Sequence, residues 1–111
     1  MIEQKDVIAF FDERAGEWDA GMVRSDEKIG CILDNAKVTA GSRVLDIACG
    51  TGVLIGDYLR RNVESVTAVD ISPEMIRIAR EKFPQENVRF VCGDAETAPL
   101  GEGFDAIVIY N

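Results

Sequence analysis

The fold of this 111-residue chain is decided by residues 44–52, Val-Leu-Asp-Ile-Ala-Cys-Gly-Thr-Gly. The first half of this stretch is a short apolar run, which is typical of a buried strand, and the second half is a glycine turn. From Val53 to Asn62 apolar residues recur at helical spacing, so a helix is expected directly after the turn. Strand, turn and helix together predict the first unit of an α/β sheet.

The same alternation continues toward the C-terminus. Further strands are expected at Glu64–Asp70, Val88–Cys92 and Phe104–Tyr110. A helix is expected to begin after Ser72, the capping residue, with Pro73 in its first position. Strands that alternate with helices predict right-handed βαβ units and an open, doubly wound parallel sheet, whose ligands bind beyond the carboxyl ends of the strands.

Two helices are expected ahead of the first strand. Apolar residues recur at helical spacing from Val7 to Trp18, and a second helix is expected from about Ser25 to Val38. We therefore predict one domain over residues 1–111, with N-terminal helices in residues 1–40 and a βαβ core in residues 43–111.

Composition excludes several classes of function. Twenty acidic against twelve basic residues give a net charge of −8, which disfavours direct binding to nucleic acid. The chain has no histidine and an odd number of cysteines, three, so a metal finger and a histidine-activated nucleophile are not expected. We see no signal peptide and no membrane-spanning run, and a cytoplasmic location is therefore expected.

The glycine turn has the features of a ligand-binding loop. Gly50 and Gly52 let the backbone approach a ligand that a Cβ would exclude. A dinucleotide fingerprint also begins in this way, but Ile55 stands at its third glycine position. Asp46 places a carboxylate beside the turn, which suits an ammonium or sulfonium group better than a pyrophosphate. The alternative is a plain strand–turn–helix connection whose aspartate caps local amides.

Two further acids follow the next strands. Asp70 lies 18 residues after Gly52, at a position from which a carboxylate accepts hydrogen bonds from both ribose hydroxyls. Support of the turn before Ser72 is the alternative role for Asp70. In the segment 93–96, Gly-Asp-Ala-Glu, an acidic side chain and a backbone N–H are placed to meet an adenine edge, although a simple turn has the same composition. Taken together, these acids predict a nucleoside site.

In this order the motifs resemble those of class I S-adenosylmethionine-dependent methyltransferases. Val44–Gly52 closely resembles the glycine motif of that family, Val69–Met75 resembles the second motif, and Gly93–Ala95 the third. Phe104–Tyr110 is similar to the fourth strand. Phe11–Asp19 resembles the N-terminal helix of the branch that modifies small molecules and quinone precursors. The resemblance extends over nearly the whole chain.

The resemblance implies a cofactor, S-adenosylmethionine, a product, S-adenosylhomocysteine, and a small-molecule methyl acceptor. The cofactor-binding residues that it implies are Asp46, Ala48, Gly50, Thr51, Gly52, Asp70, Ile71, Asp94 and Ala95. Asp46 would lie near the ammonium group, and Asp70 would hold the ribose. Ile71 would pack on adenine, whose edge Asp94 and Ala95 would contact.

Other positions carry weaker implications. Ala48 departs from the family, in which many members have glycine at this position. An aromatic residue on a helical stripe is more often packing than a lid, and we interpret Trp18 in that way. Tyr110 and Asn111 would border the transferring methyl group, but neither is assigned as catalytic. The catalytic residues stay unknown and no metal is expected.

The family fold continues past its fourth strand, whereas this chain ends at Asn111. We therefore expect the N-terminal half of a Rossmann-like methyltransferase fold, with about four strands in the family order 3-2-1-4 and helices on the sheet faces. Strand four is then an apolar edge, and the 93–103 connector is too short for a covering helix. A homodimer formed through that edge or the uncovered face is one expected consequence. Two alternative functions stay open: a non-catalytic S-adenosylmethionine-binding or assembly module, and an NAD-dependent dehydrogenase domain.

Overall fold

The helices and strands alternate along the chain in the computed structural model, which describes residues 3–20 and 24–110. Their order is α1 (Gln4–Trp18), α2 (Asp26–Asn35), β1 (Arg43–Ile47), α3 (Ile55–Arg60), β2 (Ser65–Asp70), α4 (Pro73–Lys82), β3 (Val88–Cys92) and β4 (Ala106–Ile109). None of the helices among the described residues has the length and apolarity needed to cross a membrane.

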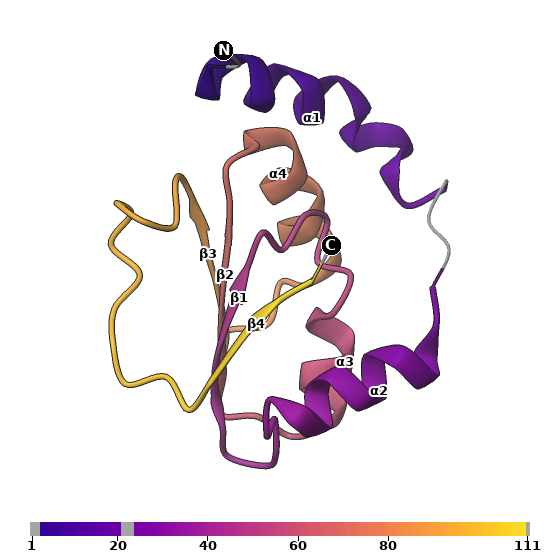
Figure 1. Cartoon of the computed structure of the whole chain (residues 1–111), viewed down its shortest axis with the longest axis vertical. Coiled ribbons are helices and arrows are strands. Elements are labelled where there is room, and N and C mark those ends of the chain that lie inside the picture. The colour runs from indigo at the N-terminus through magenta and orange to yellow at the C-terminus, as the bar shows by residue number, and fades with distance from the viewer. Residues whose placement is uncertain (1–2, 21–23, 111) are drawn as a thin grey trace.

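The strands form one parallel sheet in the order β3-β2-β1-β4, which confirms the predicted order (Figure 1). Val44 of β1 stands opposite Val66 of β2 on one side and Ala106 of β4 on the other. Because the pairing is parallel, the carboxyl ends of all these strands lie at the same edge of the sheet. In Figure 1, α1 lies across this edge.

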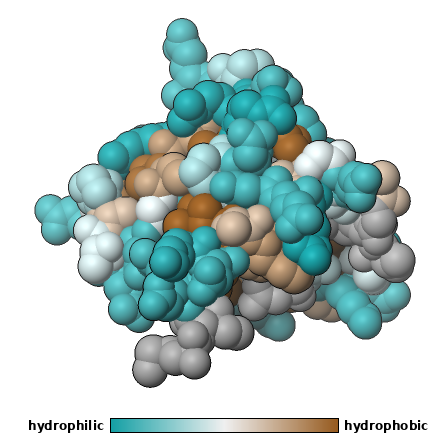
Figure 2. Space-filling view, turned by 90° about the horizontal axis from the view of Figure 1, so that it is seen from above, coloured by the Kyte–Doolittle hydropathy of each residue, from teal (hydrophilic) through white to brown (hydrophobic). Residues whose placement is uncertain are grey.

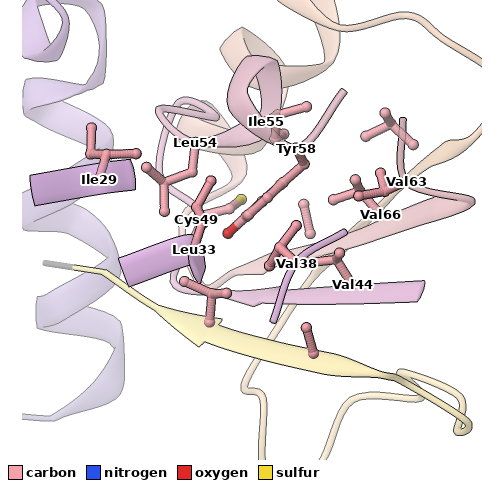
Figure 3. Close-up of a cluster of buried hydrophobic side chains, with 14 of the residues drawn as sticks. Ile29, Leu33, Val38, Val44, Cys49, Leu54, Ile55, Tyr58, Val63 and Val66 are labelled. Atoms are coloured by element: carbon pink, nitrogen blue, oxygen red, sulfur yellow. The ribbon is translucent and has the colours of Figure 1, made fainter. Parts of the chain in front are cut away.

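The core lies between one face of the sheet and helices α2, α3 and α4. Side chains alternate between the two faces of a strand, so that Val44 and Val66 point to the same side. They pack there with Leu33 of α2 and with Ile55 and Tyr58 of α3 (Figure 3). The fully buried side chains of this cluster hold the helices on this face of the sheet.

The opposite face of the sheet carries the connector between β3 and β4. This connector, residues 93–105, forms no helix, as its length predicted (Figure 1). On β4, Ala106 and Val108 are buried in the core, whereas Ile107 and Ile109 are 57% and 61% exposed. Part of this face and the outer edge of β4 are therefore open.

Local sequence explains where the helices begin. The Ser25 hydroxyl oxygen accepts a hydrogen bond from the Lys28 amide at the start of α2, and that of Ser72 accepts one from the Met75 amide at the start of α4. Ser72 acts as the predicted cap, and Ser25 caps α2 in the same way. By contrast, α3 begins at Ile55, two residues later than expected, because Gly52 has a φ of +85° and the chain is still turning there.

Candidate cofactor-binding site

A cavity of about 610 Å³ lies beyond the carboxyl ends of β1 and β2. Its lining is mainly apolar, with carboxylates at the strand ends. The lining residues include Phe11, Trp18, Asp46, Ala48, Gly50, Val53, Asp70, Ile71, Met75, Asp94, Ala95 and Tyr110. Figure 2, which views the molecule from above, shows hydrophobic residues near the centre of this face with hydrophilic residues around them. The cavity thus lies at the edge of the sheet where the sequence predicted a ligand.

Seven of the nine predicted site residues line this cavity. The two others, Thr51 and Gly52, lie in the turn but not on the cavity wall. Thr51 is fully buried, and its hydroxyl donates a hydrogen bond to Asp19 of α1. Gly52 packs toward Ile55 and Phe83. These two residues therefore support the turn but do not line the cavity.

The glycine turn, residues 48–52, contains three residues with left-handed backbone. Gly50 and Gly52 have φ values of +58° and +85°, and Ala48 has a φ of +59°. A Cβ at Gly50 would meet nothing within 4 Å, so its backbone faces open space. The left-handed conformation of Ala48 gives a physical reason why glycine suits this position, since only glycine adopts it without a steric penalty.

The Asp70 carboxylate ties the glycine turn to the end of β2. One oxygen accepts a hydrogen bond from the Gly50 amide at 2.8 Å, and the other accepts one from the Ser72 amide at 3.0 Å. Asp70 therefore has the turn-supporting role that was the alternative interpretation. A carboxylate oxygen has more than one acceptor position, so both oxygens retain capacity for a ligand hydroxyl.

Asp46 is a buried carboxyl group of the site whose pKa is strongly perturbed. Its side chain is only 2% exposed, and its Oδ2 atom has no hydrogen-bond partner among the described residues. The pKa of this carboxyl is raised to about 7, mainly because the group is buried. The Tyr58 hydroxyl acts to lower the pKa, and the negative charge of Asp70 acts to raise it. An unpartnered carboxyl oxygen beside a cavity suits a ligand that brings a positive charge or a donor.

The raised pKa of Asp46 predicts a pH-dependent stability. Between pH 3.8, the ordinary pKa of the carboxyl, and about 7, the folded protein holds a proton that the unfolded chain has lost. The contribution of Asp46 to the free energy of unfolding therefore falls as the pH rises through this window and is constant above it. We expect Asp46→Asn to remove this slope, as measured by urea unfolding at about pH 5 and about pH 8. If the free energies of unfolding of wild type and Asp46→Asn differ by the same amount at both pH values, the pKa of Asp46 is not raised by folding.

Helix α1 closes the cavity through polar contacts that the sequence did not reveal. The Asp12 carboxylate accepts hydrogen bonds from the Ser72 hydroxyl and from the Glu74 amide at the start of α4. At the other end of α1, Asp19 pairs with Lys82 of α4 at 2.9 Å as well as with the Thr51 hydroxyl. The only signal was that both aspartates lie in the segment that resembles the family's N-terminal helix.

Two other side chains of α1 reach the site. Trp18 lines the cavity and also packs edge-to-face on Phe11, with ring centroids 5.7 Å apart, so that it is more than a packing residue. The Gln4 amide donates to the Asp94 carboxylate at 3.1 Å. Asp94 also accepts from the Glu96 amide at 2.9 Å, which is the turn geometry expected after β3.

The remaining candidates add no catalytic group. Tyr110 lines the cavity, whereas Asn111 lies outside the described residues. All three cysteines are free, and burial raises the pKa of the Cys49 thiol far above its ordinary value, so that it is a poor nucleophile. Within residues 3–20 and 24–110, no group of three potential ligands is arranged to hold a metal ion.

Comparisons with known proteins agree with this geometry. A family model described as a methyltransferase domain matches residues 44–111. A malonyl-acyl-carrier-protein O-methyltransferase of Acetivibrio thermocellus is 35% identical over 97% of this chain and 39% of its own length. A demethylmenaquinone methyltransferase of Renibacterium salmoninarum is 30% identical over 94% of this chain and 45% of its own length. The chain therefore spans less than half the length of these two curated relatives.

Solved structures show the same likeness. The crystal structure of a TehB-like S-adenosylmethionine-dependent methyltransferase from Corynebacterium glutamicum superposes with a TM-score of 0.69 at 28% identity. The superposition covers 93% of this chain and 55% of that one. On the match of sequence and fold, the chain belongs to the methyltransferase-domain family and has the class I, Rossmann-like architecture.

Proposed function

We propose that this chain forms the cofactor-binding part of an S-adenosylmethionine-dependent methyltransferase that acts on a small molecule. The observation that carries the proposal is the buried Asp46 carboxyl group on the wall of the cavity, beside a glycine turn that is open above Gly50. This arrangement suits the ammonium or sulfonium of the cofactor. Relatives named for malonyl-acyl carrier protein and demethylmenaquinone support a small-molecule acceptor.

Different residues of the cavity would bind different parts of the cofactor. Gly50 would pass beneath the methionine part, and Asp46 would face its ammonium group. Asp70 would use its remaining acceptor positions for the ribose hydroxyls. Ile71 would pack on adenine, and Asp94 with the Ala95 amide would contact the adenine edge.

Methyl transfer from a sulfonium depends more on the positioning of donor and acceptor than on protein acids and bases. When bound, S-adenosylmethionine supplies a methyl group on a positively charged sulfur. The apolar side chains around the cavity, including Phe11, Trp18 and Met75, exclude water from this region. Since positioning of donor and acceptor supplies much of the acceleration in such displacements, the absence of histidine from the sequence is no obstacle.

Calorimetric titration separates the proposed function from the dehydrogenase alternative. We expect S-adenosylhomocysteine to bind with one site per chain and NAD to give no binding heat. Binding of NAD without binding of S-adenosylhomocysteine would overturn the proposal. To separate an enzyme from a non-catalytic module, labelled methyl transfer is measured for this chain and for a longer polypeptide that adds residues after Asn111. Label transfer by either one supports an enzyme, and its absence from both favours the module.

We also propose that the chain self-associates through β4. The outer edge of this strand is open, and Ile107 and Ile109 add exposed apolar side chains beside it. Light scattering at tens of micromolar is expected to give the mass of a dimer, and the double variant Ile107→Lys, Ile109→Lys is expected to give a monomer. Phe10→Lys changes an exposed apolar residue on α1, 48% accessible, and serves as the matched control. A monomeric wild type under these conditions would refute the proposal.

A cytoplasmic location and the lack of a nucleic-acid partner are part of the same proposal. Three free cysteines are in keeping with a reducing compartment. The net charge of −8 disfavours contacts with phosphates.

A further inference from the structure

Three buried side-chain oxygens lack hydrogen-bond partners among the described residues: Oδ2 of Asp46, Oδ2 of Asp57 and the hydroxyl of Tyr58. The other oxygen of Asp57 accepts hydrogen bonds from Arg24 and Arg60, which leaves Asp46 and Tyr58 as the two groups to be explained. Tyr58 is completely buried, and Asp46 is 2% exposed. Buried polar atoms in proteins are nearly always paired, so two orphaned groups in one region call for a common explanation.

The two groups lie on the same side of the sheet. The Tyr58 ring extends from α3 toward the sheet, and its hydroxyl end lies among Leu33, Val38 and Cys49 (Figure 3). These neighbours offer no strong acceptor. Asp46 shares a strand face with Val44, which belongs to the same cluster as Tyr58.

The electrostatics of the two groups agree with this arrangement. The Tyr58 hydroxyl acts to lower the pKa of Asp46, and burial, followed by the nearby Asp46 charge, raises the pKa of Tyr58. The other titratable groups that act on this pair do not help the carboxylate: Asp70 opposes its ionisation, and Cys49 has a raised pKa and stays neutral. The charge of Asp57 raises the pKa of Tyr58, as the charge of Asp46 does. Helix α2 contributes apolar side chains such as Leu33.

We propose that Tyr58 is a positioning residue for cofactor binding, whose hydroxyl donates to Asp46 and holds that carboxylate in its charged form toward the cavity. This inference rests on the proposed function, in which Asp46 faces the ammonium group of the ligand. It gives Tyr58 a role beyond filling the core. A tyrosine that merely filled the core would be replaceable by phenylalanine at every pH.

The first experiment follows the charge of Asp46 without any ligand. An infrared titration monitors the carboxylic-acid band of Asp46, assigned by its loss in Asp46→Asn. In the wild type the midpoint is expected near the pKa of about 7. In Tyr58→Phe we expect the midpoint to rise by about one unit, because a hydrogen bond to the charged form is lost. An unchanged midpoint would overturn the inference.

Two controls accompany the titration. Tyr110→Phe removes a hydroxyl from a residue on the cavity wall and is expected to leave the midpoint unchanged. Replacing the tyrosines with a fluorinated tyrosine, which is a stronger donor, is expected to lower the midpoint while keeping the native side-chain shape. This second measurement tests the inference even if Tyr58→Phe does not fold. No shift with the fluorinated residue would count against the inference.

The second experiment measures ligand affinity against pH. At about pH 7 we expect Tyr58→Phe to bind S-adenosylhomocysteine roughly fivefold more weakly, since a midpoint raised by one unit leaves fewer molecules charged. The deficit is expected to vanish at about pH 9. Methylthioadenosine lacks the amino-acid part, so wild type and Tyr58→Phe are expected to bind it with equal affinity at both pH values. Equal weakening of S-adenosylhomocysteine at every pH would show a purely structural role. If no adenosyl ligand binds the wild type, the proposed function fails while the infrared result still decides the role of Tyr58.

Discussion

Replacing Asp70 with alanine is expected to weaken the binding of S-adenosylhomocysteine by at least tenfold. Charge-assisted hydrogen bonds are worth about 1.5–3 kcal/mol each, and loss of about 1.4 kcal/mol is a factor of ten in affinity. Asp70 also accepts hydrogen bonds from the amides of Gly50 and Ser72. Removal of its carboxylate therefore loosens the glycine turn in addition to removing the ribose contact. The measurement is a calorimetric titration of wild type and variant, with unfolding in urea followed in parallel.

The matched control for this variant is Asp105→Ala. Asp105 accepts a hydrogen bond from the Arg43 amide at 2.9 Å, and it precedes β4 at the opposite edge of the sheet. It tests the loss of a carboxylate that supports a backbone amide but is remote from the cavity. Asp70→Asn keeps one acceptor oxygen and is expected to lie between wild type and alanine. Unchanged ligand affinity in Asp70→Ala would exclude Asp70 from the binding site.

Gly52→Ala is expected to destabilise the fold more than any other single change in the turn. The φ of +85° at Gly52 disfavours any residue with a side chain. A Cβ there would also lie 3.0 Å from Cδ1 of Ile55 and 3.1 Å from the ring of Phe83. We expect a loss of about 2–4 kcal/mol in the free energy of unfolding from backbone strain and overpacking together.

Gly50→Ala is the matched variant at the other glycine of the turn, and it tests ligand binding rather than stability. Its φ of +58° is one that alanine adopts with moderate strain, as Ala48 already does at +59°. A Cβ at Gly50 meets nothing within 4 Å, so that the loss of stability is expected to be only about 1 kcal/mol. Because that Cβ would project where the ligand is proposed to lie, affinity for S-adenosylhomocysteine is expected to fall by more than tenfold. Full ligand affinity in Gly50→Ala would contradict the placement of the cofactor over the turn.

The sequence was sufficient to predict the sheet and its ligand-binding edge. Apolar runs before the glycine turn and before Asp70 are local signals, and parallel pairing then brings the strand ends together. The strand order 3-2-1-4 came from family resemblance and is confirmed. Element ends were less certain: β4 begins at Ala106, two residues later than expected, after Gly103 turns with a φ of +82°.

The contacts of the site were harder to predict because they join residues far apart in sequence. No spacing indicates that Asp19 accepts a hydrogen bond from the Thr51 hydroxyl, or that Asp12 accepts one from the Ser72 hydroxyl. Tyr58 gave only the signal of an apolar position on a helical stripe. Its relation to Asp46 depends on how α3 packs on the sheet, which is a property of the folded chain.

A crystal structure of the chain with S-adenosylhomocysteine tests the central claim most directly. The account predicts ligand density over the glycine turn, with the ribose hydroxyls at Asp70 and the ammonium group at Asp46. Well-ordered protein with no ligand at the ends of β1 and β2, or with the ligand bound elsewhere, would contradict it.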